Sequence, residues 1–166
     1  MVEQSIDITG IPDGTYRITV WTADASENRA QRAFLVTLDT VVPTVGSTTT
    51  PSVITPNGDR RSDVTSLGWS AGERVTGTGR ILDKNGVTVR SWALAAGTSG
   101  ATIWDGRDNA GKAAVDGRYV YRVAGFDPAG NATLRDLPMN VDRTIASVGW
   151  SSSSFDPRAG QASRLS

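Results

Sequence analysis

The sequence of 166 residues contains no cysteine and no histidine. The chain therefore cannot form a disulfide, a Ser-His-Asp triad, a cysteine nucleophile or a zinc site with the usual nitrogen and sulfur ligands. These absences remove several of the commonest hydrolytic and metal-dependent chemistries. They favour a protein that is not an enzyme.

An excess of charge of either sign is also lacking, because 17 Lys and Arg residues balance 17 Asp and Glu residues. This balance argues against a nucleic-acid partner. No run approaches 18 apolar residues, so we expect no membrane insertion. The first ten residues have neither the basic region nor the apolar stretch of a signal peptide.

Apolar residues at helical spacing are nearly absent, and period-two alternation takes their place. Residues 15–22 put Tyr16, Ile18 and Val20 on one face, and residues 118–126 alternate in the same way. The 18 glycines suit short strands joined by many turns. The pattern predicts an all-β fold.

One hairpin is marked by Asn85-Gly86, which separates two strand-like runs. Asn-Gly favours a type I′ turn, because both central residues of that turn need a positive φ. We expect strands near 74–83 and 87–94.

The two ends of the chain share a repeat at a constant offset of 103 residues. Asp13-Gly14-x-Tyr16 matches Asp116-Gly117-x-Tyr119. The other matched pairs are Val20 and Val123, Asp24 and Asp127, Asn28 and Asn131, Asp39 and Asp142, and Val45 and Val148. A period near 100 residues is typical of an immunoglobulin-like antiparallel β-sandwich. The repeat therefore predicts tandem modules.

Four motifs in order support a family resemblance. They are Thr55-Pro56-Asn57-Gly58-Asp59, Trp104-Asp105-Gly106, Asp116-Gly117-x-Tyr119 and Asp127-Pro128-Ala129-Gly130-Asn131. Together they resemble the FlgD-type immunoglobulin-like module over about residues 50–142. The resemblance implies a β-sandwich that serves as a spacer, scaffold or attachment module in a secreted bacterial protein. Arg60 stands where the family usually has glycine, which argues against a specialised backbone conformation at that position.

Repeat and resemblance together suggest three parts. Residues 1–42 are expected to be the C-terminal part of a bacterial Ig-like module, and residues 43–142 a complete FlgD-type module. Residues 143–166 would be the start of a third module or a disordered tail.

Two acidic loops are candidate metal sites. Asn57, Asp59 and Asp63 offer oxygen ligands of the kind that calcium prefers, and Asp105 and Asp108 form a second group. The alternative is that these side chains bond their own backbone in ordinary turns. We therefore expect the protein either to have no cofactor or to bind structural calcium.

Five tryptophans raise the possibility of sugar stacking, although tryptophan is also a common core residue of small sandwiches. Trp92 is the best candidate for exposure and hence for a ligand contact. The core is predicted from alternation to contain Leu67, Trp69, Val75, Ile81, Val89, Trp92, Ile103, Trp104, Tyr119, Tyr121, Val123 and Val141.

The sequence thus predicts a non-catalytic spacer or scaffold module of a bacterial protein located outside the cell or on its surface. The expected partners are neighbouring Ig-like modules of the same chain. Two alternatives stay open: a carbohydrate or cell-wall binding module, and a self-assembling segment of an extracellular filament or sheath subunit.

Overall fold

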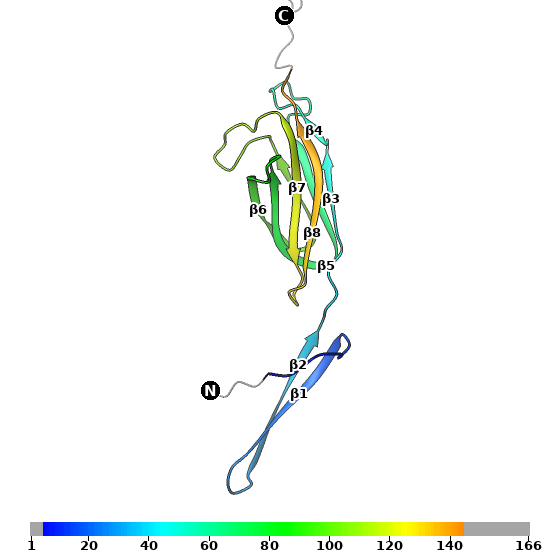
Figure 1. Ribbon diagram of the computed structural model, residues 1–166, viewed down its shortest axis with the longest axis vertical. Helices are drawn as coiled ribbons and strands as arrows, with labels where there is room; N and C mark the ends of the chain where they lie inside the picture. Colours follow the sequence, from blue (N-terminus) through cyan, green and yellow to red (C-terminus); the bar gives the residue numbers. More distant parts are fainter. Residues whose placement is uncertain (1–4, 145–166) are drawn as a thin grey trace, which may run out of the picture.

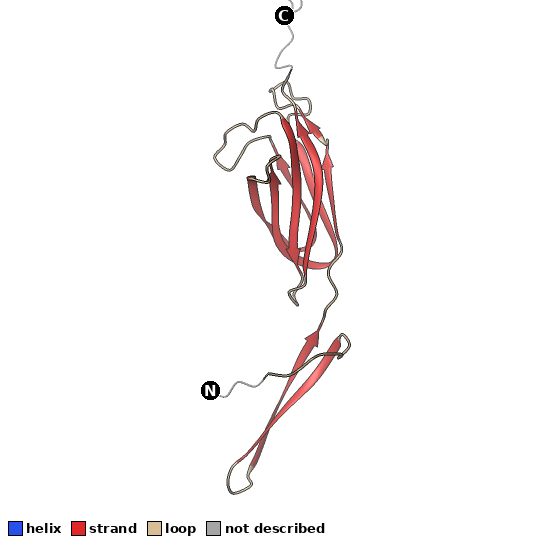
Figure 2. Ribbon diagram, in the orientation of Figure 1, coloured by secondary structure: helices blue, strands red, loops and turns tan. Residues whose placement is uncertain are grey.

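The computed structural model describes residues 5–144, which form an N-terminal hairpin and a central β-sandwich (Figures 1 and 2). All regular structure in this range is β-strand, as the alternation predicts, and no helix within it could cross a membrane. The strands are β1 (Gly14–Ala23), β2 (Arg29–Leu38), β3 (Val45–Thr50), β4 (Val53–Ile54), β5 (Thr65–Leu82), β6 (Thr88–Trp104), β7 (Gly117–Phe126) and β8 (Ala132–Val141).

The sandwich is one hydrogen-bonded ladder folded into two layers at β5 and β6. The strand order is β3-β5-β7-β8-β4, and β6 pairs with β5. The register of β5 with β6 shifts between Ser70 and Val75, and the two halves of β5 have different neighbours. The first half lies between β3 and the end of β6, and the second half lies between β7 and the start of β6. Such irregularities bend a strand, which lets it contribute to both layers.

One strand pair departs from the antiparallel expectation. β4 pairs in parallel with the end of β8, through Val53 with Asn140 and Ile54 with Val141. Pro51 separates β4 from β3, and proline cannot donate to a ladder, so the chain leaves β5 at this point. It continues in the same direction at the other edge of the sandwich.

The core follows the alternation along β5, β7 and β8, and nine of the twelve residues predicted to form it are buried. Val89 and Trp92 are partly buried and pack against it. The prediction for Ile103 is wrong: its side chain is 60% exposed. Its neighbour Trp104 faces inward, and successive residues of a strand point to opposite faces. The buried hydrophobic residues are Ile54, Leu67, Trp69, Val75, Ile81, Leu82, Leu94, Trp104, Ala114, Tyr119, Tyr121, Val123, Met139 and Val141.

The hairpin predicted around Asn85-Gly86 is confirmed, since β5 and β6 pair antiparallel up to Leu82 and Thr88. The turn type differs from the expectation. Gly86 has a φ of 79°, but Asn85 does not have a positive φ, so the turn is not type I′. It is a type I turn followed by a left-handed glycine, the usual geometry of a slightly longer hairpin loop.

The N-terminal hairpin, β1 with β2, repeats the register of β7 with β8. Gly14 pairs with Leu38 and Gly117 with Val141, so both members of the pair differ by 103 (117 − 14 and 141 − 38). All ten pairs of one hairpin correspond to the ten pairs of the other at this offset. The sequence repeat thus coincides with a repeat in strand pairing.

Candidate functional site

The loop between β4 and β5, residues 55–64, is the opening loop of the sandwich. It brings Asn57, Asp59 and Asp63 together, but their oxygens already accept hydrogen bonds. Asp63 Oδ1 accepts the N–H groups of Asn57 and Gly58 at 3.0 and 2.9 Å. Its Oδ2 accepts the Arg60 N–H at 2.7 Å. The Gly58 N–H has the largest effect on the pKa of Asp63. Together the three N–H donors hold this pKa below its usual value, although burial acts to raise it.

Asp59 has a comparable role in the same loop, because its Oδ1 accepts the Arg61 N–H at 2.7 Å. An ion bound by Asp63 would have to compete with three backbone donors. Calcium at this loop stays a prediction.

Arg60 adopts a φ of 69°, in the left-handed region that glycine favours. The expectation that this position lacks a specialised backbone conformation is therefore wrong. The Arg60 N–H points at the Asp63 carboxylate, which explains why the loop keeps this conformation despite the side chain.

Asp105 and Asp108 sit in the loop between β6 and β7 and serve different turns. Asp105 Oδ1 accepts the Arg107 N–H at 3.2 Å. Asp108 Oδ1 accepts the N–H groups of Ala110 and Lys112 at 2.9 and 2.8 Å. Neither joins a group of three potential metal ligands within residues 5–144. A calcium ion here also remains a prediction.

The turn at Asp108 is one of four turns built alike, each starting with an aspartate. Each turn has five residues, and the aspartate is residue 1. The N–H of residue 1 donates to the carbonyl of residue 5, and the N–H of residue 4 donates to the carbonyl of residue 1. The aspartate Oδ1 accepts the N–H of residue 5. The fourth residue always has a positive φ. The four turns span residues 24–28, 83–87, 108–112 and 127–131. Much of the acidic content of the loops therefore caps turns.

The loop between β6 and β7 also covers the free edge of β6, a role that the sequence did not reveal. The Asn109 N–H donates to the Val89 carbonyl at 3.1 Å, and its Oδ1 accepts the Ser91 N–H at 3.2 Å. Arg90 Nη1 donates to the Asp108 carbonyl at 3.0 Å. Covered in this way, the edge presents fewer unpaired groups to other chains.

The predicted ligand residue Trp92 is partly buried and lies against the core. Its ring stacks on Tyr121 with centroids 5.9 Å apart. A Cβ added at Gly79 would lie 2.3 Å from the Trp92 indole, so glycine is required for this packing. Trp21, on β1, is the more accessible tryptophan, with 67% of its surface exposed.

The remaining tryptophans within the described residues are Trp69 and Trp104, and both are buried. Trp104 Nε1 donates to the Arg107 carbonyl at 2.8 Å. Trp150 lies outside the described residues.

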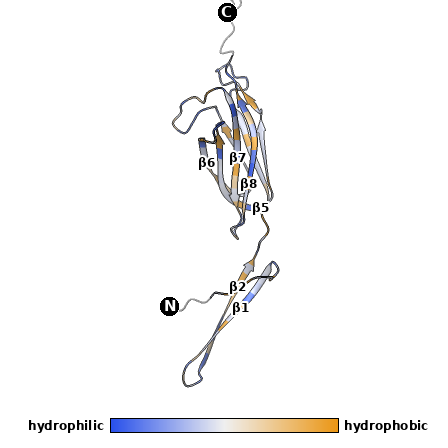
Figure 3. Ribbon diagram, viewed as in Figure 1, coloured by the Kyte–Doolittle hydropathy of each residue, from blue (hydrophilic) through white to orange (hydrophobic). Residues whose placement is uncertain are grey.

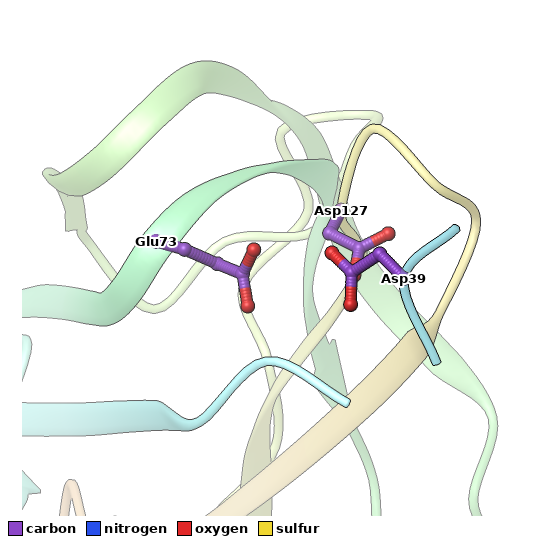
Figure 4. A group of neighbouring side chains, drawn as sticks. All are labelled: Asp39, Glu73 and Asp127. Carbon is purple, nitrogen blue, oxygen red and sulfur yellow. The ribbon is translucent and has the colours of Figure 1, made fainter. Parts of the chain in front are cut away.

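Three carboxylates meet where the hairpin joins the sandwich, and the sequence did not point to this group (Figure 4). Asp39 follows β2, Glu73 lies at the bend of β5, and Asp127 follows β7. One oxygen from each lies within 4.8 Å of the others. Carboxylates at this separation repel one another, and they are also the ligand type that calcium prefers. Only the folded chain brings them together, from positions up to 88 residues apart (127 − 39).

Asp127 is the anchor of this group, with only 3% of its surface exposed. Burial acts to raise the pKa of Asp127. Hydrogen bonds from the Asn131 side chain and from backbone N–H groups outweigh burial and lower that pKa below its usual value. Asn131 Nδ2 also donates to the Asp39 carbonyl at 3.0 Å, so one side chain connects the sandwich to the chain leaving β2.

At the opposite end of the sandwich, Arg143 connects several loops. Its guanidinium donates to the carbonyl oxygens of Pro56, Gly106 and Ala114 and lies 3.7 Å from the Asp116 carboxylate. The Arg143 guanidinium therefore holds the loops of this end together, whereas the end at the hairpin brings three carboxylates together.

Part of this architecture matches a known protein family. Residues 61–128 match the family model of the FlgD Ig-like domain. The match spans β5, β6 and β7 and confirms the resemblance drawn from the motifs. It does not include the hairpin β1–β2. Comparison with curated proteins finds no match.

Among solved structures, the chain is similar to dimeric latent PorU from Porphyromonas gingivalis, with a TM-score of 0.46 and 18% sequence identity. The alignment covers 79% of this chain and 12% of the PorU chain, so this chain spans a small part of that protein's length.

Proposed function

We propose that residues 43–142 form a non-catalytic spacer or scaffold module of a bacterial secreted or cell-surface protein. One observation carries the proposal: the chain joins the module at one end and leaves it at the other. β3 begins beside the hairpin, and β8 ends at Val141 at the far end of the long axis (Figure 1). A module connected in this way adds its own length to the chain. FlgD-type modules recur in secreted bacterial proteins, which supports a location outside the cell.

The proposed partners are neighbouring Ig-like modules of the same chain. Residues 1–42 would be the closing part of a preceding module, as the shared register of β1–β2 and β7–β8 supports. The predicted third module, from residue 143, falls almost wholly outside the described residues. The joint at residues 39–44 is held by specific contacts: Asn131 donates to Asp39, Gly72 donates to Thr44, and Pro43 is buried. These contacts favour a defined angle between successive modules.

A distance measurement between the two ends tests the spacer proposal. Because the chain has no cysteine, Ser26→Cys in the hairpin turn and Arg61→Cys in the opening loop can be labelled uniquely. Pulsed electron paramagnetic resonance should give one narrow distance distribution. The pair Arg61→Cys with Lys84→Cys, both inside the sandwich, sets the width expected for a rigid body. Asn131→Ala should broaden only the first distribution.

If the distance distribution between positions 26 and 61 is much broader than that of the control pair, the joint moves freely. That result would contradict a spacer of defined length. Carbohydrate binding is the second candidate, and the exposed Trp21 favours it. It predicts retention of the chain on a bacterial cell-wall glycan and loss of that retention with Trp21→Ala. The spacer proposal predicts no retention of either protein.

A further inference from the structure

The hairpin β1–β2 has hydrophobic residues along its strands (Figure 3), and those on one face stay partly exposed within residues 5–144. Residues opposite each other in an antiparallel pair share a face, and the pairs Tyr16 with Val36 and Ile18 with Phe34 lie on one side. Tyr16 is 37% exposed, Phe34 47% and Val36 45%. An isolated two-stranded hairpin is marginally stable in water, so this face needs a partner.

The equivalent face of β7–β8 shows how such a face is buried. At the offset of 103, Tyr16 corresponds to Tyr119 and Val36 to Met139, and these are 3% and 1% exposed. The two tyrosines also make the same bond. The Tyr16 hydroxyl donates to the Pro12 carbonyl at 2.6 Å, and the Tyr119 hydroxyl donates to the Val115 carbonyl at 2.7 Å. Register, face and hydroxyl contact thus agree between the hairpins.

The elements that cover β7–β8 all come from the residues just before it. Trp104 meets Tyr119 edge to face, with ring centroids 5.7 Å apart, and Ile54, Leu67 and Trp69 belong to the same core cluster. These residues lie on β4, β5 and β6. Residues 43–113 therefore form the half of the sandwich against which the β7–β8 hairpin packs.

We propose that the apolar face of β1–β2 binds an Ig-like half-sandwich of the type formed by residues 43–113, supplied by polypeptide that precedes the hairpin. The occupant is argued from the internal equivalence, because β7–β8 receives its cover from the chain before it. The inference rests on the module boundaries proposed above. It goes further by naming the binding face and the chemistry of its partner: strands with inward Trp, Leu and Val side chains.

Two fused chains test the proposal. In the first, residues 43–113 are placed directly before residues 11–166. The added segment then ends as many residues before Tyr16 as residue 113 lies before Tyr119 in the original chain. The second adds Ile18→Tyr, Phe34→Leu, Val36→Met and Leu38→Val, which give the hairpin the inward side chains of β7–β8. Amide hydrogen exchange of β1–β2 is measured in both and in the original chain. We expect protection to rise by about 100-fold or more in the second fused chain, with a smaller rise in the first.

A matched pair of substitutions identifies the face. In the second fused chain, a serine at position 34, on the inward face, should abolish the added protection. Leu35→Ser changes a residue on the other face, 76% exposed, and should leave it intact. Hairpin amides that stay unprotected in both fused chains would overturn the proposal.

Self-association is the competing outcome. If the original chain forms a dimer in light scattering that Phe34→Ser converts to a monomer, the face binds a second copy and the proposal is wrong. Failure here is separable from failure of the spacer function. A narrow end-to-end distance with an unprotected hairpin would contradict only the half-sandwich proposal.

Discussion

The hydroxyl of Tyr119 donates a hydrogen bond to the carbonyl oxygen of Val115, 2.7 Å away. This contact fixes the chain that enters β7 against the ring that fills the core. Two residues along the same face, the hydroxyl of Tyr121 is buried and has no hydrogen-bond partner among residues 5–144. Burial raises the pKa of Tyr121 to about 12. The two tyrosines thus have similar burial but opposite hydrogen-bond status.

This contrast predicts opposite effects of the same substitution. Tyr119→Phe should lower the free energy of unfolding by about 1 kcal/mol, because it leaves the Val115 carbonyl without its donor. Tyr121→Phe should leave stability unchanged or raise it by up to about 1 kcal/mol, because it removes a hydroxyl that is buried without a partner. Urea titration of both variants measures the difference. Equal losses would mean that the Tyr121 hydroxyl is bonded in solution.

Arg60 provides a second matched test. A left-handed backbone costs a side-chain-bearing residue about 1–2 kcal/mol, and glycine avoids this at an entropic cost of about 0.5–1 kcal/mol. Arg60→Gly should therefore raise the free energy of unfolding by about 0.5–1 kcal/mol. Arg61→Gly, at a neighbouring position without a positive φ, should lower it by a similar amount. Thermal melts decide, and a loss of stability in Arg60→Gly would show that the Arg60 side chain makes a compensating contact.

Local rules were sufficient for much of the fold. Alternation placed Leu67, Val75, Tyr121 and Val123 in the core, and Asn-Gly located the hairpin between β5 and β6. These features depend on side-chain direction and turn geometry within a few residues. Ile103 was misassigned because it was placed in the core together with its neighbour Trp104, and successive residues of a strand point to opposite faces.

The group of three carboxylates at the joint could not be predicted because its residues are distant in sequence. Asp39, Glu73 and Asp127 meet only after β5 bends and β7 pairs beside it. The metal prediction instead followed acidic residues clustered in sequence, and in the structure Asp63 and Asp108 accept backbone N–H groups. The presence of carboxylates in a loop does not show whether they face an ion or the backbone. That distinction depends on the path of the loop.

Calcium is tested by melting the chain in EDTA and in millimolar calcium. We expect overlapping curves, because an ion at the opening loop would have to displace the three N–H donors on Asp63. An upward shift of several degrees would correspond to a bound ion, since a ligand at 100 times its Kd adds about 2.7 kcal/mol. Loss of that shift in Asp59→Asn would place the ion in the opening loop. Loss in Asp39→Asn would place it at the joint.

Repulsion within the group at the joint gives a further prediction. Glu73→Gln should raise the melting temperature at pH 7 and low salt, because it removes one of three neighbouring negative charges. The gain should shrink as salt is added, because Glu73 and Asp39 are partly exposed and salt screens the repulsion of charges that water reaches. Glu27→Gln, which neutralises an exposed glutamate outside the group, serves as the control and should have little effect. A loss of stability in Glu73→Gln would mean that a cation occupies the joint under these conditions.

Acid should destabilise the sandwich in a defined range of pH. The pKa of Asp127 is lower in the folded chain than its ordinary value of 3.8, as are those of Asp63 and Asp136. A lowered folded-state pKa contributes stability that is complete above the unfolded value and is lost as the pH falls through the folded value. Urea midpoints should therefore be nearly constant from pH 7 to about pH 5 and fall steeply below about pH 4. Asp127→Asn should be less stable at pH 6, yet show a shallower fall in acid, because it cannot lose the charge that its neighbours stabilise. An acid slope identical to that of the original chain would mean that the Asp127 carboxylate is not held in its charged form by Asn131 and the turn.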